Sequence, residues 1–110
     1  MAFDEGLADR IREELAGESG VAEKRMFGGL AFLVGGHMAV SASGQGGLLV
    51  RCRPDETATL AAAPHVQRFE MRGRTMDGWL HVADAGVASD DELSRWVRIG
   101  LDYVRSVPPK

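Results

Sequence analysis

The sequence lacks the residues and runs that build disulfides, membrane spans and secretion signals. Cys52 is the only cysteine among 110 residues, so no disulfide can form within the chain. No apolar run approaches the roughly 20 residues that a membrane-spanning helix needs. The opening MAFDEGLADR has no basic segment followed by an apolar one, as a signal peptide would. These absences predict a cytoplasmic protein with a reduced thiol and no membrane contact.

The sequence also lacks a recognisable catalytic or metal-binding set. The histidines, His37, His65 and His81, have no cysteine, histidine or carboxylate partner at the spacing of a metal site. Ser41 and Ser43 alternate along an expected strand and do not occupy the sharp turn of a serine nucleophile. We therefore expect no enzymatic activity, no cofactor and no bound metal.

Length and charge are those of one small domain. A chain of 110 residues suits a single hydrophobic core, so we expect residues 1–110 to form one domain. The formal net charge of −3 argues against nucleic-acid binding through bulk charge. The sequence shows no helix-turn-helix, zinc finger or aromatic RNA platform, so direct sequence-specific DNA binding is not expected.

The central run over residues 25–53 predicts a meander of three antiparallel strands. Apolar stretches at residues 29–34, 38–43 and 48–53 have the length of strands and are separated by glycine-rich turns. Gly35-Gly36 favours a tight hairpin, because a two-residue primed turn needs positive φ and glycine has no Cβ to clash.

Alternation divides the third of these strands into two faces. Leu48, Val50 and Cys52 share one face, where Cys52 is expected to pack as a small apolar group. Leu49, Arg51 and Arg53 are expected to share the other face.

Two glycine-rich loops belong to this meander, Met26-Phe27-Gly28-Gly29 and Ser43-Gly44-Gln45-Gly46-Gly47. A loop that cradles a phosphate lies between a strand and the N-terminus of a helix, which supplies the amide donors. A strand follows each loop here, so we favour a structural role for both. The alternative is a small-ligand site, or an enzyme of unknown chemistry, built on these loops.

Helices are expected at both ends of the chain and after the meander. Apolar residues recur every fourth position from Phe3 to Leu15, and residues 54–64 predict a short helix between two prolines. Ser89 and Glu92 form a capping box at the start of the last helix. Its apolar stripe consists of Leu93, Trp96, Val97, Leu101 and Val104.

Two further strands are expected before that last helix. Residues 68–72 would place Phe69 and Met71 on one face, residues 76–82 form the second strand, and residues 72–75 the turn between them. This order of elements predicts an α+β domain: an antiparallel sheet of about five strands packed against N- and C-terminal helices.

Positive charge is concentrated in the middle of the chain. If the strands that carry it are neighbours, these arginines form a basic patch able to contact phosphates or an acidic protein face. The alternative is a solvated face on which they pair with Asp55, Glu56 and Glu70. The candidate binding residues are Arg51, Arg53, Arg68, Arg72 and Arg74.

Several short motifs recur in a fixed order along nearly the whole chain. They are Arg25-Met26-Phe27-Gly28-Gly29, then Met71-Arg72-Gly73-Arg74-Thr75-Met76 with Gly78-Trp79, the helix around Trp96, and the end from Leu101 to Lys110. In these motifs the chain resembles the N-terminal domain of the TfoX family, also called Sxy, the bacterial regulators of natural competence.

The resemblance implies a small α+β domain with a role in transcription regulation. The best-known members act with the cyclic-AMP receptor protein at competence promoters, so it implies a non-enzymatic regulatory or protein-interaction module. The partner would be a protein such as a transcription regulator, and the domain a monomer or a homodimer. Those members also have a C-terminal helical domain, which is not expected here. The family supplies no catalytic residues.

Overall fold

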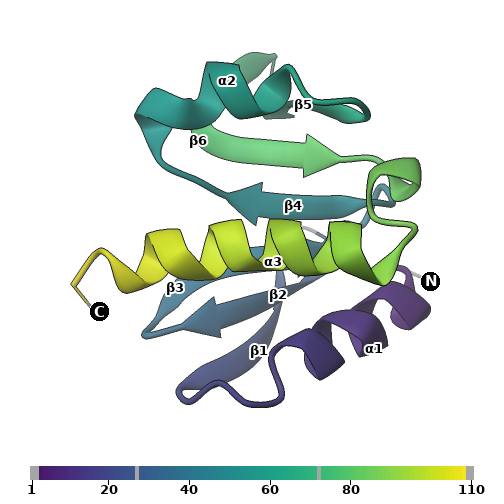
Figure 1. Ribbon diagram of the computed structural model, residues 1–110, viewed down its shortest axis with the longest axis vertical. Helices are drawn as coiled ribbons and strands as arrows, with labels where there is room; N and C mark the ends of the chain where they lie inside the picture. The colour runs from purple at the N-terminus through teal and green to yellow at the C-terminus, as the bar shows by residue number, and fades with distance from the viewer. Residues whose placement is uncertain (1–2, 27, 72, 109–110) are drawn as a thin grey trace.

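The computed structural model describes residues 3–26, 28–71 and 73–108. Within them, six antiparallel strands form one sheet in the order β1-β2-β3-β4-β6-β5, and three helices lie on one of its faces (Figure 1). This confirms the α+β class. The strands are β1 (Val21–Met26), β2 (Gly29–Val34), β3 (His37–Ala42), β4 (Leu48–Arg51), β5 (Val66–Met71) and β6 (Arg74–Val82). The helices are α1 (Glu5–Glu14), α2 (Thr57–Ala61) and α3 (Asp90–Arg105), with short 3₁₀ turns at Pro54–Glu56 and Asp84–Gly86.

Strand β1 is the sixth strand, one more than the sequence pattern predicted. It pairs with β2 from Val21 opposite Val34 to Met26 opposite Gly29. Its central side chains are exposed, so it shows no alternation of buried and exposed positions. Charged side chains on an edge strand oppose pairing with other chains, which is consistent with the sequence AEKR at its centre.

The turns are confirmed in one place and tighter than predicted in another. Gly35 and Gly36 have φ of 61° and 85°, as a primed two-residue hairpin turn requires. The turn between β5 and β6, predicted over residues 72–75, is shorter, because Arg74 and Thr75 already belong to β6. A register shift between Arg68 and Glu70 also interrupts the expected alternation along β5.

Helix α3 provides much of the hydrophobic core. Its predicted capping box is present: the Ser89 hydroxyl accepts a bond from the Glu92 amide at 3.1 Å, and the Glu92 carboxylate accepts one from the Ser89 amide at 3.4 Å. The apolar stripe of α3 faces β3 and β4, and α1 packs against both α3 and β3. Within the described residues, none of the helices combines the length and apolar character needed to cross a membrane.

Thr57 connects α2 to the sheet through a buried hydroxyl. Its Oγ1 accepts a hydrogen bond from the Gly78 amide at 2.7 Å and donates one to the Pro54 carbonyl at 2.8 Å. The carbonyl of Gly78 in turn accepts a bond from the Cys52 amide at 2.9 Å. One hydroxyl therefore satisfies polar groups of the 3₁₀ turn and of β6 at a site that water does not reach.

Replacing Thr57 by valine should lower the free energy of unfolding by about 1–3 kcal/mol, because the buried amide of Gly78 loses its acceptor. Urea denaturation measures this loss. Thr59→Val, at an exposed position of the same helix, is the matched control and should change stability by less than about 0.5 kcal/mol. Equal unfolding midpoints for the two variants would show that the hydroxyl has no such role.

Candidate binding site

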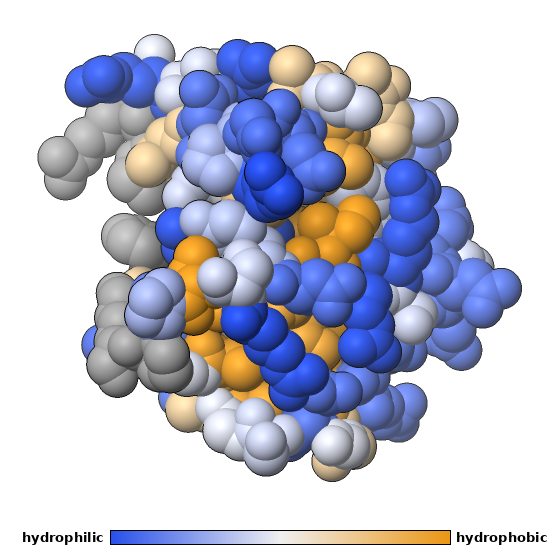
Figure 2. Space-filling view, turned by 60° about the vertical axis from the view of Figure 1, so that its left-hand side comes forward, coloured by the Kyte–Doolittle hydropathy of each residue, from blue (hydrophilic) through white to orange (hydrophobic). Residues whose placement is uncertain are grey.

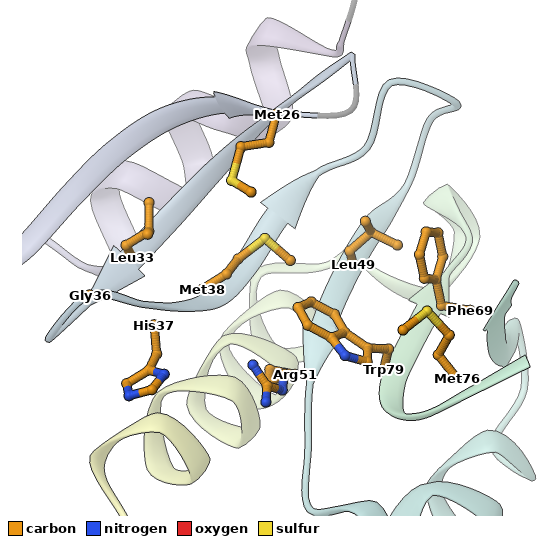
Figure 3. Close-up of a pocket in the computed structure, with 10 residues that line it drawn as sticks. All are labelled: Met26, Leu33, Gly36, His37, Met38, Leu49, Arg51, Phe69, Met76 and Trp79. Carbon is orange, nitrogen blue, oxygen red and sulfur yellow. The ribbon is translucent and has the colours of Figure 1, made fainter. Parts of the chain in front are cut away.

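The face of the sheet opposite the helices, which we call the open face, contains a pocket of about 340 Å³. Side chains from all six strands project into it (Figure 3). Hydrophobic residues also reach the surface between hydrophilic ones in the space-filling view (Figure 2). The pocket is lined by Met26, Leu33, Gly36, His37, Met38, Leu49, Arg51, Phe69, Met76 and Trp79.

The alternation of β4 explains how this pocket arises. Leu48 and Val50 are fully buried under the helices, so Leu49 and Arg51 project from the open face, as their positions in the sequence predict. The antiparallel pairing of β4 with β6 places Arg51 opposite Trp79. The lining of this pocket is therefore mostly apolar around the guanidinium of Arg51.

Arg51 lies between two aromatic rings. Its guanidinium carbon is 4.6 Å from the centre of the Trp79 ring and 5.2 Å from that of Tyr103, which α3 supplies. Such cation–π contacts are worth about 0.5–2 kcal/mol. They fix the orientation of the guanidinium without neutralising its charge.

The charge of Arg51 has no acidic partner among the residues that the structure describes. None of their ion pairs includes Arg51. Its Nε atom is buried and, within the same residues, has no hydrogen-bond acceptor. A buried donor without a partner costs about 1–3 kcal/mol, and more when the group is charged. An anion that enters the pocket beside Arg51 would supply the counter-charge that the described residues do not.

His37 lies at the rim of the pocket and is held by the chain that follows α3. Its Nε2 is 2.7 Å from the carbonyl oxygen of Pro108. Because a carbonyl only accepts, Nε2 donates this bond, which assigns a proton to that nitrogen. The contact holds the segment after α3 beside the pocket.

A second hollow of about 230 Å³ continues from the first. Met26, Met38, Leu49 and Phe69 line both, so the two hollows form one continuous surface, which we call the open-face groove. Arg51 and Trp79 lie at one end of the groove, and the other end is more polar. Its polar end includes Ser41, Ser43, Gly44, Gln45 and Glu70.

The amides of the glycine loop at this polar end are largely occupied within the protein. The Gln45 amide donates to the Ser43 hydroxyl at 3.1 Å, and the Gly46 amide to the Ser43 carbonyl at 3.1 Å. The Gly47 amide donates to Asp84 at 3.0 Å. A phosphate cradle needs several free amides pointing at the ligand. These bonds therefore favour the structural interpretation of the loop.

The arginines of the proposed basic patch have different surroundings. Arg51 is half-buried in the groove, whereas Arg53 is exposed and pairs with Asp55 at 3.1 Å. Arg68 pairs with Asp77 at 3.7 Å, and exposed pairs of this kind contribute at most about 1 kcal/mol. Arg74 is exposed at the start of β6, and Arg72 lies outside the described residues. Binding of phosphates or of an acidic protein face by this set stays a prediction.

Chemically reactive groups are few in the described part of the chain. No group of three histidine, cysteine or acidic residues there has the geometry to hold a metal ion. Burial raises the pKa of the Cys52 thiol, which keeps it protonated and poorly nucleophilic. His81 Nε2 is 2.7 Å from the Gly46 carbonyl, so this ring is tied to the loop. The expectation of a non-enzymatic protein stays a prediction.

Most of the sequence motifs that define the resemblance have a structural role here. Gly28, Gly73 and Gly78 have φ of 76°, 78° and 88°, in the left-handed region that favours glycine. A Cβ on Gly29 would lie 2.4 Å from the Ala42 carbonyl oxygen, so β2 and β3 require a glycine there. Phe27 lies outside the described residues. Of the remaining motif residues, Arg25 lies over the ring of Phe3. Met26 and Trp79 line the groove, and Trp96 is in the core.

The groove was not predicted from the sequence, although part of its signal is present there. Met38, Leu49 and Trp79 each lie on the open face of a separate strand. The alternation placed Leu49 and Arg51 on one face, but nothing in a single strand shows that neighbouring strands add further apolar groups. Only the strand order β3-β4-β6 brings these residues together.

Comparison with known proteins agrees with the resemblance. Neither a curated protein nor a solved structure matches the chain. The sequence model of the TfoX N-terminal domain family matches residues 13–103, a span from within α1 to near the end of α3. The chain therefore belongs to the TfoX N-terminal domain family.

Proposed function

We propose that this protein is a non-enzymatic regulatory module that acts by binding, with the open-face groove as its binding surface. The observation that supports this most is the groove itself, an apolar hollow that holds one half-buried arginine without an ion-pair partner among the described residues. Concave apolar surfaces with a few polar groups are the usual form of binding sites. The helices cover the opposite face and stabilise the sheet that holds the groove.

The regulatory part of the proposal rests on family membership. The domain belongs to the TfoX N-terminal domain family, and its motifs resemble those of competence regulators. We therefore propose a transcription regulator, the cyclic-AMP receptor protein, as the partner, reached through protein–protein contact. The apolar groove suits a protein–protein interface, because the cores of such interfaces are depleted in charge and enriched in aromatic residues and methionine.

Fluorescence anisotropy with a labelled promoter duplex and the receptor tests this proposal. Addition of the domain should increase the anisotropy only when the receptor is present. Met76→Glu places a charge on the open face, at a side chain that is 37% exposed, and should weaken the complex at least about tenfold because burying an unpaired charge is costly. Ala58→Glu, an exposed position on α2, adds the same charge on the helical side and should have little effect.

Two results would contradict the proposal. Unchanged binding of the Met76→Glu variant would exclude the open face as the contact surface. Binding of the duplex by the domain alone, lost at moderate salt, would indicate unspecific attraction of arginines to phosphate.

A further inference from the structure

We propose that the open-face groove binds small apolar carboxylic acids as their anions, with the carboxylate against the guanidinium of Arg51. The inference rests on the proposed function, because it uses the same binding surface, and it adds the chemical class of a ligand. The surroundings of Arg51, the shape of the groove and the nature of its walls each support one part of the inference.

The need for an anion follows from the surroundings of Arg51. Its Nε is buried and lacks an acceptor among the described residues, and no acidic side chain lines the 340 Å³ pocket in that part of the chain. A carboxylate can accept two parallel N–H···O bonds from a guanidinium, and in this pocket it would supply the counter-charge that the described residues do not. A cationic ligand would meet an uncompensated like charge.

The aromatic neighbours prepare the guanidinium for this contact. Trp79 and Tyr103, at 4.6 and 5.2 Å, hold its plane in place before a ligand arrives. Preorganisation of this kind reduces the side-chain entropy lost on binding. The flexible ammonium of a lysine would not be held by stacking in the same way.

The walls distinguish a carboxylate from a phosphate. Besides Arg51, the pocket lining includes one other basic side chain, His37, whose Nε2 already donates to the Pro108 carbonyl, while Leu49 and Trp79 are apolar walls. A phosphate dianion has more acceptor oxygens and more charge than one guanidinium satisfies, so entry into this pocket would strip its hydration without adequate replacement. A carboxylate has two acceptor oxygens and one charge, which match a single arginine.

The remaining surface fits an apolar body of modest size. Leu49 and Phe69 lie along the middle of the groove, and Met38 and Met76 provide flexible, polarisable side chains. A pocket of about 340 Å³ is at the lower end of the range for ligand sites, which indicates a small molecule. Because methionines adapt their shape, we expect a class of apolar acids to bind.

Equilibrium dialysis with radiolabelled octanoate tests the inference, with 1-octanol and octylamine as neutral and cationic probes of the same chain length. The wild-type domain should retain octanoate and bind the other two far more weakly. Arg51→Met should reduce octanoate affinity about ten- to a hundredfold, because a charge-assisted pair is lost. Arg53→Met removes a nearby exposed charge and should leave the affinity within about twofold.

Folding of the Arg51 variant is checked separately by thermal denaturation. Methionine removes a half-buried charge whose Nε has no acceptor, which offsets the lost contacts with Trp79 and Tyr103, so the variant should melt close to wild type. Arg51→Lys keeps the charge but not the stacked, two-pronged geometry, so it should recover only part of the affinity.

Three results would overturn the inference: no octanoate retained at millimolar concentration, octanol bound as tightly as octanoate, or full affinity in a folded Arg51→Met variant. Loss of octanoate binding with an intact receptor complex would reject the ligand class and leave the proposed function standing. Octanoate binding without any receptor complex would support the ligand site and reject the proposed protein partner.

Discussion

Replacing Trp96 by alanine should lower the free energy of unfolding by about 3–5 kcal/mol, the range for truncation of large buried aromatic side chains. Trp96 is 3% exposed and belongs to the stripe of α3 that packs against the sheet. Its removal leaves a cavity between α3 and the layer beneath, which a rigid sheet cannot close by shifting. Small domains have about 5–15 kcal/mol of stability in total, so this loss approaches unfolding.

Urea denaturation followed by circular dichroism measures the effect of Trp96→Ala. Arg98→Ala, two residues along α3 at an exposed position, is the control and should change stability by less than about 0.5 kcal/mol. An unfolding midpoint for Trp96→Ala equal to that of the control would mean that α3 does not depend on this side chain for its packing.

Gly100→Ala should also destabilise the protein, although alanine is normally the better helix former by about 1 kcal/mol. A Cβ at position 100 would lie 2.4 Å from the carbonyl oxygen of Ala39 and 3.1 Å from a methyl group of Val40. The first contact is with backbone of β3, so relief requires α3 to move away from the sheet. Overpacking of this kind costs about 1–3 kcal/mol or more.

The matched control for this prediction is Gly17→Ala. No atom lies within 4 Å of a Cβ built there, apart from its chain neighbours, and the position lies outside the helices. This variant should be neutral or slightly more stable, because alanine reduces the entropy of the unfolded chain. If Gly100→Ala instead raised stability by about 1 kcal/mol, as the same change does at an exposed helix position, α3 would not approach β3 so closely.

Much of the sheet could be predicted because glycine turns separate its strands. Gly35 and Gly36 adopt the positive φ that their position required, and β2 covers residues 29–34 as expected. Helix α3 was equally clear, since Ser89 and Glu92 form their capping box locally. These features depend on neighbours in the sequence, so the sequence alone contains their signal.

The parts that could not be predicted depend on neighbours in space. Strand β1 is charged and exposed, and only its pairing with β2 makes it a strand. In the sequence, Gly100 is only a poor helix former, and the need for a glycine there becomes visible once α3 lies against the backbone of Ala39. Arg51 was predicted as one of several surface arginines, but the side chains of Trp79 and Tyr103 give it a partly buried site.

The strand order also explains why the arginines have different surroundings. Arg53 follows β4 and bonds with Asp55 two residues away, while Arg68 on β5 meets Asp77 of β6. Acidic partners of this kind were weighed as the alternative to a basic patch. Arg51 has no ion pair among the described residues and lines the groove, so it is the arginine of this set that an anion in the groove would meet.

Methyl NMR of the wild-type domain during an octanoate titration tests the central claim, binding in the open-face groove, most directly. Signals of Met38 and Leu49, which line the groove, should shift in a saturable manner, whereas those of Leu93 and Leu101 in the helix-covered core should stay in place. Shifts confined to the core, or an unchanged spectrum at millimolar octanoate, would contradict the claim and leave the open face without a ligand.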